Sequence, residues 1–455
     1  MKKPLLFIFT LLSTGLYAQE HFSGINTSQR TGVLNAAINP AELTNLKNKF
    51  EVNVLNFSIN ASNNKVSIGD LFQSDTDFEE IIFSGDEPVN MTVDLEILGP
   101  SLAFKYENWA FAFTTAAKLK SDIVDVDTGL GRALTTESDA LSIVNEYINT
   151  DYNQRVSGTS WGEIGFSVAR DIYETDVHKF SGGVTFKLLF PGSYANIAAD
   201  KFTGTIQLGT GINTGDVVMT NASTQLNLAY SGSLADGFDS SNFTNFFAGG
   251  LNGFSTDIGI NYRWKDVNSD DGEYRVNAGI SIRNLGSMTF NDDNNESTNY
   301  KLEVTGSEEF NLSQFEGADG FDEIEAILND PANSAYVTAE EPSSDFKIKT
   351  PATLSMYADV KLLLNFHITG FLQQKLNESN DNNRIAAQNV FTITPRYSGK
   401  LFEVFAPLSS TEISGFTAGL GFRIGGFYIG SGSVVTAIVS DAKQADAYLG
   451  FRFGF

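Results

Sequence analysis

The last residues of the chain alternate strictly between two kinds of side chain. From Tyr448 to Phe455 the even positions are tyrosine, glycine or arginine, and the odd positions are the apolar Leu449, Phe451, Phe453 and Phe455. Because side chains of a β-strand point to its two faces in turn, this period of two predicts a strand. The run from Ile413 to Ile424 alternates in the same way. Such strands suit either a soluble sheet or a membrane barrel with aromatic side chains toward lipid.

Residues 1–18 have the parts of a secretory signal peptide. Two lysines follow Met1, an apolar core runs from Leu5 to Leu12, and Ala18 provides a small residue at the cleavage site. No later stretch approaches the ~20 continuous apolar residues of a membrane helix. The chain has no cysteine, which excludes disulfides, lipoprotein attachment and thiolate chemistry. We therefore expect an exported protein without an inner-membrane anchor.

The composition indicates a folded, acidic protein. It is 42% hydrophobic and 19% charged, and its formal charge of −25 disfavours nucleic acid as a partner. The length would suit about three domains, but a barrel of about 14 strands (range about 12–16) with ~10 residues each also fits. We expect an all-β fold, a transmembrane antiparallel β-barrel over residues 50–455. Residues 19–49 lack alternation and are expected to form an N-terminal plug.

The clearest internal hairpin runs from Phe254 to Arg283. Its first strand places Ile258, Ile260 and Trp264 on one face, opposite glycine and polar residues. Tyr262, Trp264 and Tyr274 lie beside the polar turn at residues 266–272. Aromatic residues at the ends of such strands are typical of the girdle at a membrane interface.

Connections between the expected strands alternate between short and long. The long ones are acidic and cover residues 63–90, 121–158, 231–253, 291–345 and 377–384, with short helices expected at residues 139–149 and 321–328. Membrane barrels have short periplasmic turns and long outer loops. The pattern therefore predicts the outer membrane of a Gram-negative bacterium, with both termini periplasmic. A soluble β-sandwich with elaborated loops is the alternative.

Motifs that could carry chemistry are weak. Ser160 lies in a G-x-S-x-G pattern, but the residues that follow alternate as a strand, whereas a nucleophile elbow leads into a helix. The histidines, His21, His178 and His367, lie too far apart for a sequence-local metal site, and residues 266–272 resemble a calcium loop that no glutamate closes. We expect no catalysis, no metal site and no cofactor.

Charged residues fall on the face expected to line the barrel lumen. The candidates are Asp257, Arg263, Arg275, Arg283 and Arg423. One interpretation is a set of ion pairs that fills a closed barrel. The other is an excess of positive charge that receives an anionic headgroup, such as a carboxylate.

Four short motifs lie along the chain. They are Asn39-Pro40-Ala41, Asp257–Tyr262, Ile282–Gly286, and the aromatic end with Gly425–Gly430 before it. As a set they resemble the FadL-like superfamily of outer-membrane barrels, which includes fatty-acid transporters and the PorV-like barrels of type IX secretion. The run Gly425–Gly430 with the aromatic end at Tyr448–Phe455 looks closest to an uncharacterised branch from type IX-secreting bacteria. The resemblance implies a hatch containing Asn39, Pro40 and Ala41. It also implies an insertion signal at Phe451, Phe453 and Phe455 for the barrel-assembly machinery.

Three functions remain open from the sequence. The first is hatch-gated binding or passage of hydrophobic or amphiphilic molecules, with a hydrophobic small-molecule ligand and outer-membrane lipid as partners. The second is a non-transporting accessory or scaffold role among the subunits of an envelope secretion complex. The third and most remote is an outer-membrane lipase built on Ser160.

Overall fold

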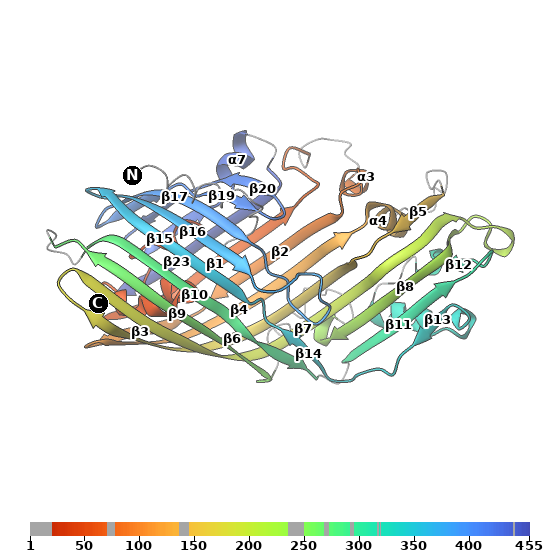
Figure 1. Ribbon diagram of the computed structural model, residues 1–455, viewed down its shortest axis with the longest axis horizontal. Helices are drawn as coiled ribbons and strands as arrows, with labels where there is room; N and C mark the ends of the chain where they lie inside the picture. The colour runs from red at the N-terminus through yellow and green to blue at the C-terminus, as the bar shows by residue number, and fades with distance from the viewer. Residues whose placement is uncertain are drawn as a thin grey trace, which may run out of the picture.

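The two ends of the barrel sequence pair with each other. In the computed structural model, β1 (Phe50–Asn63) lies antiparallel to β23 (Gln444–Gly454), and the backbone groups of Phe50 and Phe455 bond reciprocally. This pairing closes one continuous sheet into a ring (Figure 1). The structure describes residues 21–70, 78–135, 145–234, 250–267, 273–291, 295–315, 318, 320–439 and 442–455. The signal peptide expected at residues 1–18 lies outside these ranges.

Among the described residues the ring contains about fourteen antiparallel strands, which confirms the predicted fold class and strand number. Some ring strands are interrupted and carry two labels. In ring order they are β1; β2 (Val89–Leu98) with β3 (Ser101–Tyr106); β4 (Trp109–Val126); β6 (Asn153–Glu174); β7 (His178–Leu208); β8 (Val217–Ser231) with β9 (Gly253–Lys265); β10 (Tyr274–Phe290); β14 (Phe346–Lys349) with β15 (Thr353–Leu363); β16 (Phe366–Lys375); β17 (Val390–Ser398); β18 (Phe402–Phe405) with β19 (Leu408–Thr411); β20 (Gly415–Ala418) with β21 (Leu420–Ile424); β22 (Phe427–Ser431); and β23.

The outer wall of the ring exposes apolar side chains on alternate residues. On β9, Ile258 is 50% and Ile260 is 58% exposed, whereas Asp257 before them and Asn261 after them are buried. The same alternation exposes Phe180, Val184 and Phe186 on β7 and Leu449, Phe451 and Phe453 on β23. A continuous apolar exterior around a closed sheet is the surface of a transmembrane barrel. Within the part of the chain that is described, none of the helices has the length and apolar character needed to cross a bilayer.

One side of the barrel continues well past the rest. β7 has 31 residues, which at about 3.3 Å each and a tilt of about 40° span roughly 80 Å, about three times the apolar band of a membrane barrel. Its second half pairs with β5 (Glu146–Asn149) and β8, and β8 pairs with β11 (Glu296–Val304) and β12 (Phe310–Asn311). β13 (Val337–Ala339) completes this part, which we call the extension.

The extension has a hydrophobic core of its own. α6 (Phe321–Leu328) packs on one face of its sheet, and Phe202, Ile206, Tyr300 and Phe310 are buried there. The helix predicted at residues 321–328 is thus confirmed. The helix predicted at residues 139–149 is wrong for residues 146–149, because they form β5 along the edge of β7; residues 139–144 lie outside the described ranges.

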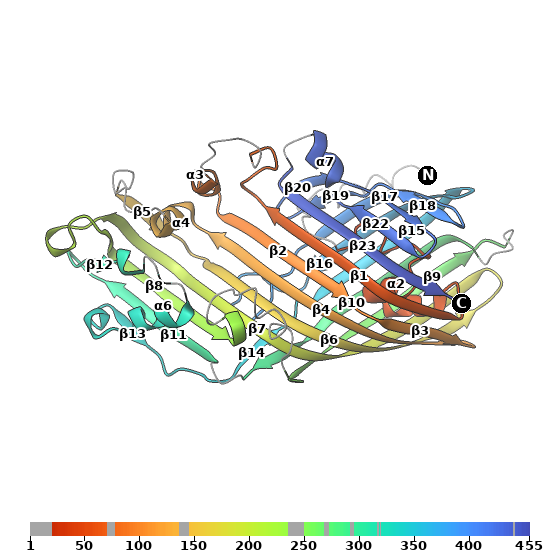
Figure 2. The ribbon, with the colours of Figure 1, turned by 180° about the vertical axis from the view of Figure 1, so that it is seen from behind.

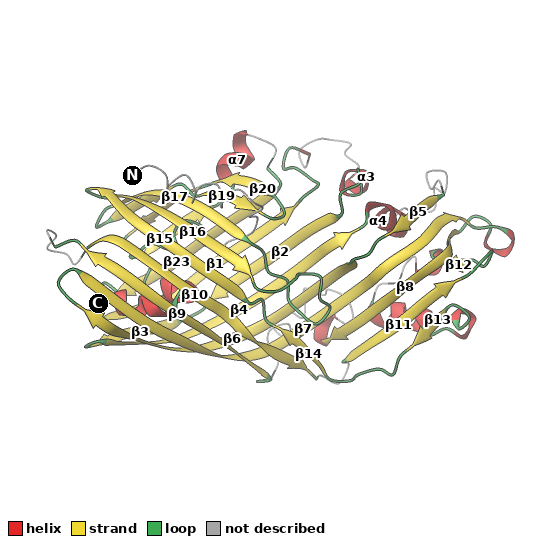
Figure 3. Ribbon diagram, viewed as in Figure 1, coloured by secondary structure: helices red, strands yellow, loops and turns green. Residues whose placement is uncertain are grey.

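The remaining helices of the described chain are short (Figure 3). They are α2 (Val33–Ile38), α3 (Phe78–Ile82), α4 (Thr128–Thr135) and α7 (Val434–Val439), with 3₁₀ turns η1 (Pro40–Asn45), η3 (Gly211–Asn213), η4 (Gly232–Leu234), η6 (Ser313–Phe315) and η7 (Pro331–Asn333). Short turns and the chain end share one end of the barrel, which we call the short-turn end. The extension lies at the opposite, long-loop end (Figure 1).

Candidate functional site

The N-terminal segment lies inside the ring. Residues 22–46 are buried apart from Arg30 and Ala37, which are half-buried. The segment folds as α2 and η1, and Figure 2 shows α2 near the end of the barrel where β23 finishes. η1 packs against β6, β7 and β9. We refer to residues 21–49 as the hatch segment.

The Asn39-Pro40-Ala41 motif begins η1 and joins it to the wall. Asn39 caps the turn, because its Oδ1 accepts a hydrogen bond from the Ala41 backbone N–H at 3.0 Å. Pro40 occupies the first helical position, where a missing N–H costs nothing. The Asn39 amide also donates to the carbonyl oxygen of Ile260 at 2.8 Å. The motif therefore shapes the turn and attaches it to β9.

Glycines on the lumen face of the wall leave room for this turn. A Cβ added to Gly183 would lie 2.5 Å from the Pro40 carbonyl carbon, and one added to Gly259 would lie 2.1 Å from Asn39 Oδ1. A Cβ on Gly279 would likewise approach the Asn39 amide nitrogen to 2.6 Å. These glycines alternate with the exposed apolar residues of the same strands, so they are needed where the hatch segment touches the wall.

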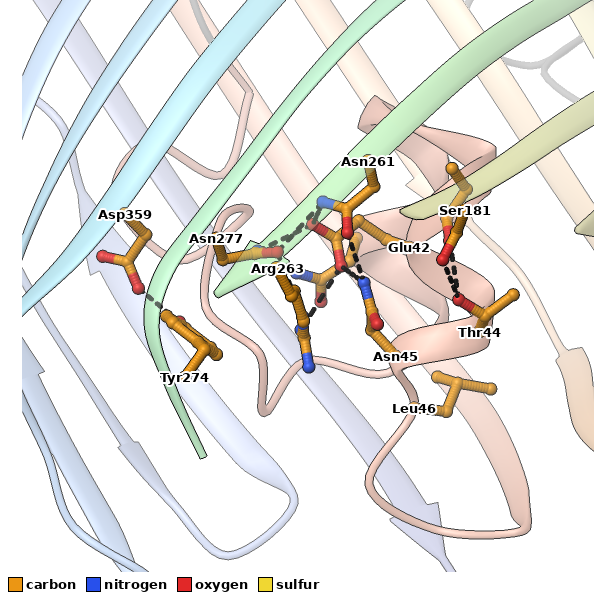
Figure 4. A network of polar contacts seen from close by, with 12 residues as sticks. Glu42, Thr44, Asn45, Leu46, Ser181, Asn261, Arg263, Tyr274, Asn277 and Asp359 are labelled. Carbon is orange, nitrogen blue, oxygen red and sulfur yellow. Dashed lines mark hydrogen bonds and ion pairs between the residues drawn. The ribbon is translucent and has the colours of Figure 1, made fainter. Parts of the chain in front are cut away.

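A buried carboxylate, Glu42, holds the hatch segment to the wall (Figure 4). Its Oε1 accepts hydrogen bonds from Asn261 at 2.9 Å and Asn277 at 2.8 Å, and from the Tyr357 hydroxyl at 2.5 Å. Its Oε2 accepts from Asn45 at 2.8 Å and lies 3.4 Å from a guanidinium nitrogen of Arg263. We call Glu42 with these five partners the latch. Sequence reasoning missed Glu42, although an acid in the first turn after an Asn-Pro cap is a recognisable signal.

A second set of contacts supports the latch from β7. The Thr44 hydroxyl donates to Ser181 Oγ at 2.9 Å, and Ser181 donates to Asp171 at 2.7 Å. Lys179 lies 3.0 Å from Asp171 and donates to the Thr44 carbonyl oxygen at 3.0 Å. The hatch segment is therefore held by hydrogen bonds from at least β7, β9, β10 and β15.

The charges predicted for the lumen are mostly found there, with partners. Asp257 lies 2.8 Å from Lys187 and accepts from the Asn284 backbone N–H. Arg423 is paired with the buried Glu403. Arg263 joins Glu42, and Arg283 donates to the Ala37 carbonyl oxygen at 3.2 Å and to Gln373. These contacts agree with a lumen filled by paired charges.

The lumen position predicted for Arg275 is wrong. A bulge between Tyr274 and Val276 shifts the register, so Tyr274 points inward to Asp359 and Arg275 is exposed. The guanidinium of Arg275 lies 5.8 Å from the ring centroid of Trp264, a residue of the outer wall, and pairs with Asp266 at 3.4 Å. Strict alternation from Arg283 back to Arg275 cannot reveal such an extra residue.

Directly beyond the hatch segment lies a cavity of about 170 Å³. The hatch segment lines the cavity with the apolar side chains of Val33, Leu34 and Ile38. The barrel wall lines it with Trp161 and Phe371. Charged residues line it too, but in pairs: Lys120 is 3.0 Å from Asp94, and Lys118 is 3.5 Å from Glu163. The cavity is thus amphiphilic, without an excess of one sign among these contacts.

A second segment, residues 376–389 between β16 and β17, also lines the cavity. Ala386, Ala387 and Gln388 line the cavity, and Ile385 is buried beside Trp161. Arg155, only 1% exposed, donates to the carbonyl oxygens of Ser379 at 2.9 Å, Asp381 at 2.6 Å and Arg384 at 3.0 Å. We call residues 376–389 the inner loop.

Ser160 lacks the setting of a nucleophile elbow. It is fully buried in the interior of β6, and its hydroxyl oxygen accepts from the Ser193 backbone N–H at 3.1 Å. His178 contacts Tyr262 and His367 contacts Asp359, so neither is placed beside Ser160. Across the described ranges, no three His, Asp or Glu side chains gather as metal ligands; residues 268–272 of the calcium-like run lie outside them.

Three solved structures illustrate the similarities of this fold. They are a TodX deltaS2S3 mutant monoaromatic hydrocarbon channel (11% identity, 92% of this chain and 94% of that chain, TM-score 0.46), the P. putida toluene transporter TodX (10%, 93% and 94%, 0.43), and a Pseudomonas aeruginosa FadL homologue (9%, 96% and 98%, 0.43). A search of curated proteins finds no match. The pattern of the family described as "Family of unknown function (DUF5723)" matches residues 40–432. The chain therefore belongs to the DUF5723 family.

Proposed function

We propose that this protein is an outer-membrane barrel that binds hydrophobic or amphiphilic small molecules in its lumen and passes them when the hatch segment moves. The observation that carries the proposal is the amphiphilic cavity lined by both the hatch segment and the inner loop. Its apolar residues suit an acyl or aromatic group. Its paired charges, with Arg283 beside them, suit a polar headgroup that carries little net charge.

The hatch segment is the proposed gate. It is held by side-chain hydrogen bonds and by ion pairs such as that of Glu42 with Arg263, which can break without unfolding the sheet. We place the short-turn end in the periplasm and the long-loop end outside, in keeping with the loop lengths. The accessory role in a secretion complex and the relation to PorV-like barrels stay predictions.

A reversible lock tests the gate. The chain has no cysteine, and the Thr44 and Ser181 hydroxyl oxygens are 2.9 Å apart, so Thr44→Cys with Ser181→Cys should form a disulfide between hatch and wall. In proteoliposomes, we would measure how fast a fluorescent lysophospholipid becomes protected from extraction by albumin. Oxidation should slow this transfer at least tenfold, and a thiol reductant should restore it.

A matched pair controls for the disulfide itself. Thr392→Cys with Ser409→Cys joins directly paired residues of two wall strands whose hydroxyl oxygens are 3.0 Å apart, so neither cysteine belongs to the hatch segment. Its transfer rate should be the same oxidised and reduced. If the oxidised Thr44/Ser181 pair transfers lipid as fast as the reduced one, the hatch is not the gate. If vesicles with the unmodified barrel transfer the lysophospholipid no faster than vesicles without protein, the proposed passage of this amphiphile is wrong.

A further inference from the structure

A second hollow, of about 610 Å³, lies between the extension and the inner loop. We call it the vestibule. Its lining is rich in side-chain amides: Asn153, Gln225, Asn227, Asn299, Asn380 and Asn382. The inner loop contributes to both hollows, so it separates the vestibule from the lumen cavity. Its volume lies within the range of about 300–1,000 Å³ that is usual for small-molecule sites.

Two amides of the vestibule, Asn227 and Asn299, belong to a ladder of hydrogen bonds across neighbouring strands that begins at the buried Asn196. The Asn196 amide of β7 donates to Asn227 Oδ1 of β8 at 2.8 Å. Asn227 donates to Asn299 Oδ1 of β11 at 2.9 Å, and Asn299 donates to Glu340, just after β13, at 3.0 Å. These contacts fix the orientation of each amide before any ligand arrives, which lowers the entropy cost of binding.

The ladder leaves hydrogen-bonding capacity unused. A side-chain amide has two N–H donors and an oxygen with two lone pairs. The ladder contacts of Asn227 engage one donor and one lone pair, so one of each remains for a ligand. Gln225, two residues along β8 on the same face, is exposed beside it. A row of groups that both donate and accept at fixed spacing is complementary to a row of hydroxyl groups.

The charges around the vestibule argue against an anionic ligand. Asp151, Asp200 and Glu340 line it, while its lysine, Lys301, is already paired with Glu303 at 2.5 Å. The half-buried Tyr152 adds an aromatic side chain to the lining. Amides, carboxylates and an aromatic ring together match an uncharged ligand with many hydroxyls and apolar C–H faces.

We propose that the vestibule is a binding site for a neutral carbohydrate. This site differs from the lumen cavity in its chemistry as well as its place, so the inference goes beyond passage of amphiphiles and does not depend on it. With the long-loop end outside the cell, the ligand would be a glycan met at the cell surface.

The test starts with the full chain in detergent on an array of neutral, acidic and amino oligosaccharides. We expect neutral members to bind, and titration calorimetry of the tightest one to give a single site. Gln225→Leu and Asn299→Leu should each weaken its affinity at least tenfold. Asn365→Ala removes an amide at the short-turn end, whose partner is Tyr397, and should leave the affinity unchanged.

Three outcomes would overturn the proposal. The first is binding of acidic or amino oligosaccharides only, and the second is no binding at all. The third is that both vestibule variants bind the neutral oligosaccharide with the affinity of the parent while their thermal unfolding also matches that of the parent. The oxidised Thr44→Cys, Ser181→Cys protein separates this site from the gate. It should bind the neutral oligosaccharide as the reduced protein does, whether or not the lock affects lipid transfer.

Discussion

At the scale of single residues, Glu42 brings together the most contacts between hatch and wall. Replacing it with alanine would leave Arg263, Asn261 and Asn277 buried without their shared acceptor. Breaking a buried pair in this way costs about 3–5 kcal/mol. We expect Glu42→Ala to undock the hatch segment while the barrel stays closed. Hydrogen exchange measured by mass spectrometry should then show faster exchange over residues 33–46 and unchanged exchange in β9.

Glu42→Gln is the matched variant. It keeps the shape and one acceptor oxygen, so the loss should be smaller, about 1–3 kcal/mol. Exchange over residues 33–46 should therefore fall between that of the parent and that of Glu42→Ala. Equal protection in all three proteins would mean that the latch does not hold the hatch.

A second residue-scale prediction concerns the glycines beneath the hatch. In Gly259→Ala the new methyl group would overlap Asn39 Oδ1, so either the hatch or the strand must shift. Overpacking of this kind typically costs about 1–3 kcal/mol. Gly370→Ala is the control, because it lies in β16 with nothing within 4 Å of its added Cβ. Hydrogen exchange over residues 39–45 should quicken in Gly259→Ala alone. Equal exchange over residues 39–45 in the two variants would show that Gly259 is not needed to make room for the hatch segment.

At the scale of elements, α6 is docked through a carboxyl group. Glu325 bonds to the Tyr230 hydroxyl, lies 3.2 Å from the Tyr300 hydroxyl, and is close to Glu296. Burial first, and then the hydrogen bond with Glu296, raises the pKa of Glu325 above its usual value. Burial and the charge of Glu325 also raise the pKa of Tyr300 to about 12, so its hydroxyl stays neutral.

The raised pKa fixes the sign of a pH effect. A carboxyl group whose pKa is higher in the docked state binds its proton more tightly there. The stability that Glu325 gives to the docked α6 is therefore fully present at low pH and is lost as the pH rises through the raised pKa. Limited proteolysis within residues 320–336 should be slower at pH about 4 than at pH about 7. Glu325→Gln should remove this difference.

Glu309 in the same extension supplies a control of opposite sign. Hydrogen bonds from Thr210 and Asn213 lower its pKa, so the turn at residues 209–213 should loosen as pH falls. If proteolysis at residues 320–336 and at residues 209–213 changes with pH in the same direction, the cause is general unfolding and not the titration of Glu325.

Elements were predictable where one face of a strand meets a uniform environment. The hairpin of β9 and β10 follows from alternation because lipid-facing and lumen-facing residues must differ. Arg275 was misplaced because a bulge changes the phase without changing composition. Residues 291–345 were expected to be a loop with one helix at residues 321–328. The helix was correct, but the loop also contains the strands β11, β12 and β13, because α6 covers a sheet face that lies beyond the barrel. The latch depends on side chains far apart in sequence, which no local pattern links.

At the scale of the whole molecule, two contrasting environments divide the sheet. Along the barrel the exposed face is apolar, whereas in the extension the corresponding face is covered by α6 and a core of its own. The extension, whose strands β8 and β11 line the vestibule, lies at the long-loop end of the barrel (Figure 1). The lumen cavity is lined by two segments, the hatch segment and the inner loop, and side-chain hydrogen bonds attach both of them to the wall. The proposed passage would therefore require both the hatch segment and the inner loop to move, while the barrel wall stays intact.

One pair of arginine substitutions can test whether the outer wall faces lipid while the extension faces water. Ile258 on β9 lies six residues from the aromatic Trp264, about 15 Å along the barrel axis, which places it near the middle of the apolar band. Ile258→Arg should therefore destabilise the barrel by about 2–4 kcal/mol in urea unfolding from phosphatidylcholine vesicles. Ile212, 99% exposed in η3 at the tip of the extension, is the matched position in water. Ile212→Arg should change the free energy of unfolding by less than about 0.5 kcal/mol. An equal loss in the free energy of unfolding at the two positions would show that the exposed wall does not face acyl chains. The lumen could then not be a passage across a membrane.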